Sequence, residues 1–169
     1  PKKNFNKVLS DFYAAGIDVK IITGDNALTT ATIASQVGFR GAENSMDGAM
    51  LQTLPEATRS ITIANTNIFT RMFPEAKLTI VNALKSMGKI VAMTGDGVND
   101  GPALKAAHIG IAMGNKGSEI AKRAASLVLT DDNLEKMVDA IAMGRRIYTN
   151  LRKAIRYIIS IHIPIILTV

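Results

Sequence analysis

The stretch from Met93 to Gly114, MTGDGVNDGPALKAAHIGIAMG, decides the fold of this 169-residue chain. Residues typical of a buried strand, Ile90 to Ala92, lead into it, and a second apolar run follows at Ile109 to Ala112. Pro102 lies between the two runs and suits the first turn of a helix, where its missing N–H is not needed. The order strand, turn, helix, strand predicts one unit of a parallel α/β sheet.

The turn after the first of these strands is rich in oxygen ligands. Asp96, Asn99 and Asp100 fall within a few residues of one another, and Gly95 and Gly97 permit the tight backbone of such a turn. Hard oxygen ligands at a strand end suit Mg²⁺, which keeps several waters and usually shares its shell with a phosphate. The turn therefore predicts a magnesium site formed by Asp96, Asn99 and Asp100.

A second strand-to-helix turn lies earlier in the chain. Residues Val19 to Ile22 are typical of a buried strand, and they end in Thr23-Gly24-Asp25-Asn26. A helix is expected from Ala27 to Val37, and Gly38 would end it. Taken alone, this turn is more typical of a strand-to-helix connection with a capping residue than of a functional site, and the functional alternative stays open.

Together these segments resemble a known family. TGDGVND followed by PALK and IGIAMG is similar to the hinge region of the P-type cation-transporting ATPases, membrane pumps of the haloacid dehalogenase superfamily. Ile68 to Lys77, IFTRMFPEAK, resembles the family's FAR-x-x-PxxK segment, and the TGD turn stands before it in the order that the family requires. The resemblance implies that Thr23 and Gly24 hold phosphoryl oxygens, with Asp25 beside them, and that Lys77 contacts an aspartyl phosphate.

The chemistry that the resemblance implies is phosphoryl transfer, which depends mainly on positioning and charge neutralisation. Mg²⁺ and the Lys77 ammonium would supply positive charge, with ATP as the substrate. The Thr23 hydroxyl and the backbone around Gly24 and Gly95 would complete the phosphate cradle. Lys77, Thr23, Gly24 and Asp25 are the candidate catalytic residues, and they should meet at the carboxyl ends of parallel strands.

One part of the family's machinery does not occur in the sequence. The nucleophile is an aspartate in a DKTGT segment, which forms a covalent aspartyl phosphate, and no such segment lies between Pro1 and Val169. The nucleotide domain is missing too. We therefore expect a piece of a larger pump, inactive alone, whose partners are the nucleotide, actuator and remaining membrane segments of the parent protein.

The excess positive charge is concentrated near the end of the chain. The net charge is +6, and residues 140–169 contain no acid but five basic residues, Arg145, Arg146, Arg152, Lys153 and Arg156. The sequence has no cysteine, which excludes disulfides and thiolate metal sites.

The basic segment is expected to lie on a helix that enters a bilayer. Asp131-Asp132-Asn133 offers an N-cap, and apolar residues recur at helical spacing from Leu134. From Tyr157 to Val169 the chain is almost wholly apolar, although about 20 residues are needed to span a membrane. We interpret this run as the start of a transmembrane helix, with residues 1 to about 156 on the cytoplasmic side. A buried core helix is the alternative. A nucleic-acid-binding helix is disfavoured because no base-reading side chains accompany the arginines.

Three residues depart from the family pattern or stand out within it. His108 replaces a usual acidic residue before IGIAMG and is expected to be a surface histidine. His162 stands where calcium and sodium pumps have a cation ligand, and Pro164 would free backbone carbonyls, so both are candidates for a cation path. The identity of the cation stays open.

The sequence therefore predicts an α/β fold with a doubly wound, mostly parallel Rossmann-like sheet of the haloacid dehalogenase type. Residues 1–133 would be part of a phosphorylation domain, 134–156 a stalk helix and 157–169 the start of a transmembrane helix. The expected function is a part in Mg²⁺-dependent, ATP-driven cation transport by a multi-pass membrane protein. The alternatives are a soluble phosphatase of the same superfamily and a catalytically silent Mg²⁺- or phosphate-binding module.

Overall fold

The computed structural model describes the backbone of residues 4–168 and the side chains of residues 4–163. The chain divides between Asn133 and Leu134 into two compact units, and each is described by itself.

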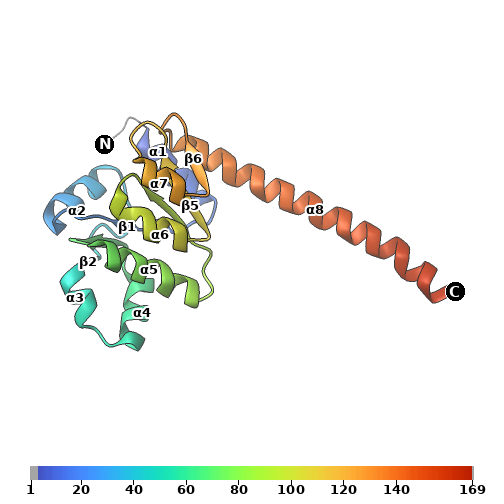
Figure 1. The fold of residues 1–169 in the computed structure, drawn as a ribbon, viewed down its shortest axis with the longest axis horizontal. Helices are drawn as coiled ribbons and strands as arrows, with labels where there is room; N and C mark the ends of the chain where they lie inside the picture. The colour runs from blue at the N-terminus through green and yellow to red at the C-terminus, as the bar shows by residue number, and fades with distance from the viewer. Residues whose placement is uncertain (1–3, 169) are drawn as a thin grey trace. The chain divides into compact units, whose positions relative to one another are not determined.

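Strands and helices alternate through the first unit (Figure 1). Its helices are α1 (Phe5–Ala14), α2 (Ala27–Gln36), α3 (Gly48–Thr53), α4 (Glu56–Asn65), α5 (Pro74–Ser86), α6 (Gly101–Ala106) and α7 (Glu119–Ala124), with a 3₁₀ turn at Val98–Asp100. Its strands are β1 (Ile21–Ile22), β2 (Ser45–Asp47), β3 (Ile68–Thr70), β4 (Ala92–Gly95), β5 (Ile109–Met113) and β6 (Leu127–Leu129).

The strands form two three-stranded parallel sheets, in the orders β1-β3-β2 and β4-β5-β6. Every pairing is parallel, which confirms the predicted α/β class. The single continuous sheet that the sequence suggests is divided in two, with α5 connecting β3 to β4. β1 and β4 are each an edge strand of their own sheet within the described residues.

Two apolar clusters hold the ends of β1, β3 and β4 close together. One includes the fully buried Phe69 and Ile80, and the other includes Met93 and Leu104. Ile22, at the end of β1, packs against both clusters. The carboxyl ends of β1, β3 and β4 are therefore held by adjoining apolar clusters, which suits a site formed at the ends of parallel strands.

Most of the local predictions are confirmed. Asn26 caps α2 by accepting a hydrogen bond from the Thr29 N–H at 2.9 Å, and Pro102 stands in the first turn of α6. The prediction of a buried strand at Ile90 is wrong, because Ile90 is 78% exposed. It follows the α5–β4 turn directly, before pairing with β5 begins at Ala92.

The loop before the second unit contains the predicted N-cap segment, and that capping role stays a prediction. The two carboxylate oxygens of Asp132 accept hydrogen bonds from the N–H groups of Asn115 (3.0 Å) and Lys116 (3.2 Å). Asp132 therefore fixes the loop after β5.

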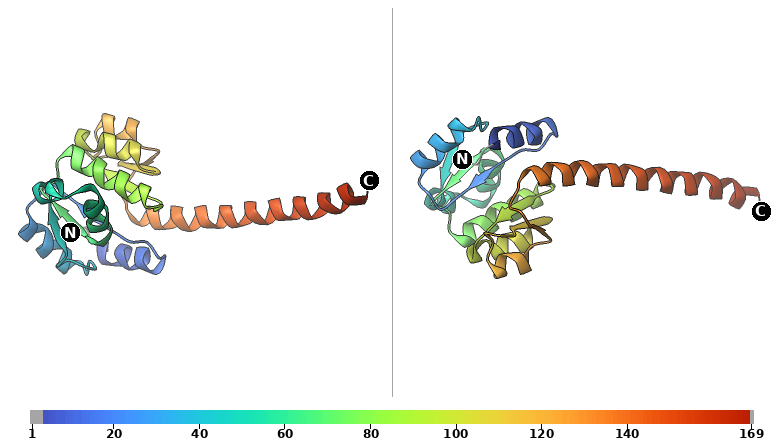
Figure 2. Two further views of the ribbon diagram at one scale, coloured as in Figure 1. Left: turned by 90° about the horizontal axis from the view of Figure 1, so that it is seen from below. Right: turned by 90° about the horizontal axis from the view of Figure 1, so that it is seen from above.

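The second unit is one long helix, α8 (Glu135–Thr168), which continues through Pro164 (Figure 2). Among the residues that the structure describes, no helix has both the length and the apolar character needed to cross a membrane. The proposed stalk and membrane boundaries within α8 stay predictions.

Candidate phosphate and metal site

The turn after β1 is organised by one threonine. The Thr23 hydroxyl accepts a hydrogen bond from the Asp25 N–H at 3.1 Å and donates one to the Asp25 carboxylate at 3.0 Å. The Thr23 N–H donates to the Phe69 carbonyl at 2.9 Å and continues the pairing of β1 with β3. Gly24 and Asp25 are exposed, so the Gly24 backbone and the Asp25 carboxylate are accessible to a ligand at the end of the sheet.

This turn is connected to the segment that carries Lys77. The Met72 N–H donates to the Thr23 carbonyl, and the Arg71 N–H donates to the Asp25 carbonyl, both at 2.9 Å. Arg71 needs an unusual backbone angle, φ 50°, to turn the chain from β3 into α5. Two hydrogen bonds therefore fix the TGD turn to the loop that leads into α5, where Lys77 lies in the first turn.

Lys77 and Asp100 form a largely buried ion pair. The Lys77 Nζ donates to Asp100 Oδ1 at 2.7 Å, and the two side chains are 15% and 9% exposed. Asp100 Oδ2 accepts from the Gly97 N–H at 3.2 Å, so both oxygens are engaged. The pair joins α5 to the loop after β4 and brings two sequence-predicted residues into direct contact.

Gly95 is required for this arrangement. A Cβ at Gly95 would lie 2.6 Å from the Asp100 Cβ, a separation that real side chains do not adopt. The bare backbone at Gly95 therefore lets Asp100 fold back over the strand end and reach Lys77.

The other two predicted metal ligands face solvent. Asp96 and Asn99 are exposed, and the Asp96 carbonyl accepts from the Ser118 N–H at 2.8 Å, which fixes the turn to the beginning of α7. Within residues 4–163, no three side chains of His, Cys, Asp or Glu form a cluster able to hold a metal. Mg²⁺ characteristically takes one or two carboxylates and completes its shell with water and phosphate. The exposed Asp96 carboxylate fits such a site, and the engaged Asp100 fits a positioning role.

The structure thus brings Lys77, Asp100 and Gly95 together and fixes the TGD turn to the loop before α5. The catalytic, phosphate and metal roles of these residues stay predictions. Sequence reasoning missed Asp47, which caps α3 through the Ala49 N–H and lies 3.5 Å from the Arg71 guanidinium. An aspartate followed by a short helical segment was the available signal.

His162 lies in α8, where its Nδ1 is 2.8 Å from the Ile158 carbonyl of the preceding turn. The Pro164 side chain lies outside the described residues. The role of His162 and Pro164 in a cation path stays a prediction.

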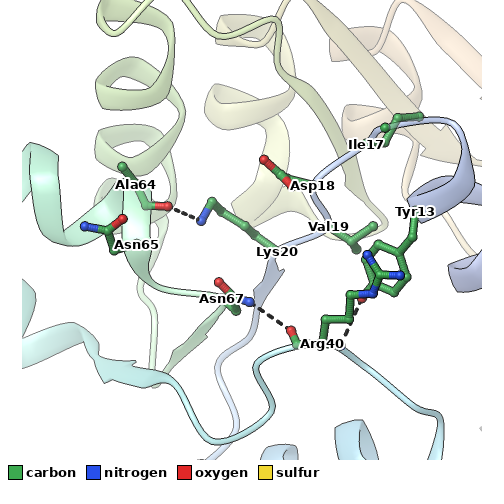
Figure 3. Close-up of a pocket in the computed structure, with 10 residues that line it drawn as sticks. Tyr13, Ile17, Asp18, Val19, Lys20, Arg40, Ala64, Asn65 and Asn67 are labelled. Atoms are coloured by element: carbon green, nitrogen blue, oxygen red, sulfur yellow. Dashed lines mark hydrogen bonds between the residues drawn. The ribbon is translucent and has the colours of Figure 1, made fainter.

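A cavity of about 500 Å³ lies at the opposite end of β1 from the candidate site (Figure 3). Lys20 lines it and donates to the carbonyls of Ala64 (2.9 Å) and Thr66 (2.5 Å), and Arg40 stacks on the Tyr13 ring with 4.2 Å to the centroid. Burial lowers the pKa of Lys20. None of the candidate-site residues lines this cavity, so the cavity is separate from the candidate site.

Comparison with known proteins identifies the family. The profile of the haloacid dehalogenase-like hydrolases matches residues 1–108. The chain is 42% identical, over its whole length, to an endoplasmic reticulum-type calcium-transporting ATPase of Arabidopsis thaliana, and 43% identical over 99% of its length to a calcium-transporting ATPase of Bacillus subtilis. It covers 17% and 19% of these two proteins, so it spans about a fifth of the length of the curated relatives.

Solved structures agree with this result. A zinc-transporting PIB-type ATPase matches 90% of the chain with a TM-score of 0.69 and 30% identity, and the chain covers 20% of that structure. The catalytic domain of a CPx-ATPase matches 83% of the chain with a TM-score of 0.64 and 25% identity, and the chain covers 45% of it. The chain therefore belongs to the haloacid dehalogenase-like hydrolase family, and its sequence and fold correspond to the C-terminal part of the phosphorylation domain of the P-type cation-transporting ATPases.

Proposed function

We propose that this chain is the part of a cation pump that binds phosphate and Mg²⁺ while ATP phosphorylates an aspartate elsewhere in the same protein. The observation that carries the proposal is the buried Lys77–Asp100 pair, fixed at the carboxyl ends of parallel strands. Burial of an ammonium is costly unless a charge partner holds it. Lys77, held beside a turn that could bind Mg²⁺, would supply positive charge of the kind that stabilises a transferring phosphoryl group.

The edges of β1 and β4 suggest where the nucleophilic aspartate of the parent protein would lie. β1 and β4 each leave one edge unpaired within the described residues, and Ile22 packs against the apolar clusters of both sheets. A parallel strand inserted between β1 and β4 would unite the sheets and end beside the TGD turn and Lys77. We propose that the strand bearing the family's DKTGT aspartate occupies this position.

Each predicted residue then has a defined task. The Thr23 hydroxyl and the Gly24 backbone bind phosphoryl oxygens, with Asp25 orienting Thr23 through the 3.0 Å hydrogen bond. Lys77 neutralises charge on the phosphate, and Asp100 holds Lys77 in place. Asp96, with Asn99 beside it, would bind Mg²⁺, which supplies electrostatic stabilisation of the phosphoryl group when bound.

The names of the relatives suggest which cation to test first. The Arabidopsis and Bacillus proteins are named as calcium-transporting, and we propose calcium as the first candidate cation. His162 and Pro164 are retained as candidate positions along the cation path. The proposal also places the parent protein in a membrane as a multi-pass protein, with residues 1 to about 156 on the cytoplasmic side.

The test is a phosphorylation assay on native membranes. Brief labelling with γ-³²P-ATP and Mg²⁺, followed by an acid quench, should leave label on a large polypeptide that contains this segment, and hydroxylamine should remove it. Asp96→Asn in the intact protein should abolish the labelled intermediate. An unlabelled product near 18.1 kDa would contradict the pump and favour the silent binding module.

A further inference from the structure

Five basic residues of α8 lie on one side of the helix. Four of them are called here the basic stripe, Arg146, Arg152, Lys153 and Arg156, and Arg145 lies beside them. At about 100° per residue they fall within a sector of about 120°, and they extend along about 15 Å of the helix axis. All four are exposed, and residues 140–169 contain no acidic residue to neutralise them.

The opposite side of the same segment is apolar. Ile147, Leu151, Ile155 and Ile158 are 53%, 57%, 56% and 54% exposed. Where a helix enters a membrane, Lys and Arg side chains near the entry point extend to the headgroups, while apolar side chains can face the acyl chains. Tyr157, directly after Arg156, is 69% exposed, and tyrosine is enriched at this boundary.

We propose that the basic stripe binds the headgroup phosphates of anionic lipids. The inference rests on the proposed function, which places the start of the membrane at Tyr157. Four to eight Lys and Arg residues next to a membrane-entering helix are sufficient to recognise anionic lipids. The guanidinium of arginine is also the side chain best shaped to bind phosphate oxygens in pairs.

The charge alone would also suit an acidic protein. The apolar run distinguishes the two occupants, because it begins at Tyr157, immediately after Arg156, without an intervening polar turn. A soluble acidic partner would leave this run in water. A bilayer with anionic headgroups accommodates the basic stripe and the run together.

The test measures binding of the complete 169-residue chain to phosphatidylcholine vesicles with and without phosphatidylserine. At low salt, phosphatidylserine should raise the affinity by up to about 600-fold, since each of the four cations near the surface contributes about fivefold. High salt should remove most of this gain. A variant with Arg146, Arg152, Lys153 and Arg156 all replaced by Gln should lose most of the preference for phosphatidylserine.

A matched control removes the same charge from exposed positions in the first unit: Lys89→Gln, Lys105→Gln, Lys116→Gln and Arg123→Gln. It should retain the preference for phosphatidylserine. An equal loss in the control would overturn the inference by showing a general charge effect, and so would tighter binding to soluble polyglutamate than to the phosphatidylserine vesicles. The phosphorylation assay is independent of this result, so failure of lipid recognition leaves the proposed pump function standing.

Discussion

Lys77 and Asp100 illustrate what a single pair of residues contributes to this site. Their ion pair is almost excluded from solvent, so each charge depends on the other for its solvation. Lys77 was found from its match to a family segment, and Asp100 from its place in an acidic turn. Their contact could not be predicted, because it depends on how α5 packs against the loop after β4.

Breaking this pair from either side should be costly. Lys77→Met or Asp100→Asn alone should lower the free energy of unfolding by about 3 kcal/mol, since each leaves a buried group without its partner. The double variant should lose less than the sum of the two. Urea unfolding of all four proteins measures the coupling, and strictly additive losses would show that the two side chains act independently.

Gly95→Ala should damage the same pair through sterics alone. The added Cβ would meet Asp100 at 2.6 Å and push its carboxylate away from Lys77. We expect a loss of about 2 kcal/mol in unfolding free energy. Gly97→Ala is the control, because its Cβ would approach Asp100 no closer than 3.5 Å. Equal losses from the two variants would argue against a steric role for Gly95.

At the scale of elements, Lys20 connects β1 to the end of α4. Its ammonium donates to the carbonyls of Ala64 and Thr66 at the carboxyl end of that helix. Positive charge at this end also favours the helix dipole. Lys20 was not singled out in the sequence, because nothing local to a lysine beside a strand indicates which distant carbonyls it will reach.

The Lys20→Met variant should show a pH-dependent difference from the wild type. Near neutral pH the variant should be less stable by about 1–2 kcal/mol, because two carbonyls lose a donor. Burial lowers the pKa of Lys20 in the folded state below 10.5, so the unfolded chain binds this proton more tightly. Wild-type stability relative to the variant should therefore rise as the pH increases from the lowered pKa towards 10.5. A constant difference across that range would contradict the pKa shift.

Elements with strong local signals were predictable from sequence. Asn26 before an apolar-periodic segment predicted α2, and Pro102 predicted the start of α6. The strand at Ile109 followed from an apolar run. β2 was not predicted, because Ser45 to Asp47 is polar and becomes a strand only through pairing with β3. α4 was not predicted either.

For the whole molecule, the sequence predicted a parallel α/β fold but not its division into two sheets. Strand order is a tertiary property, and only the structure shows β1 and β4 at edges that are unpaired within the described residues. The proposed inserted strand links this division to function, because the same strand would carry the nucleophile. Insertion of this strand would therefore join the two sheets and bring the nucleophile to the active site at the same time.

Hydrogen exchange can test this completion at one residue. The N–H groups of Ile21 and Thr23 donate to carbonyls on the β3 side, and alternation along a parallel strand directs the intervening Ile22 N–H to the open edge. In the 169-residue chain, the Ile22 amide should exchange much faster than those of Ile21 and Thr23. Within the intact pump, the inserted strand should protect Ile22 to the level of its neighbours. If Ile22 exchanged equally fast in both contexts, no strand would pair with β1, and the nucleophile would have to reach Lys77 by another route.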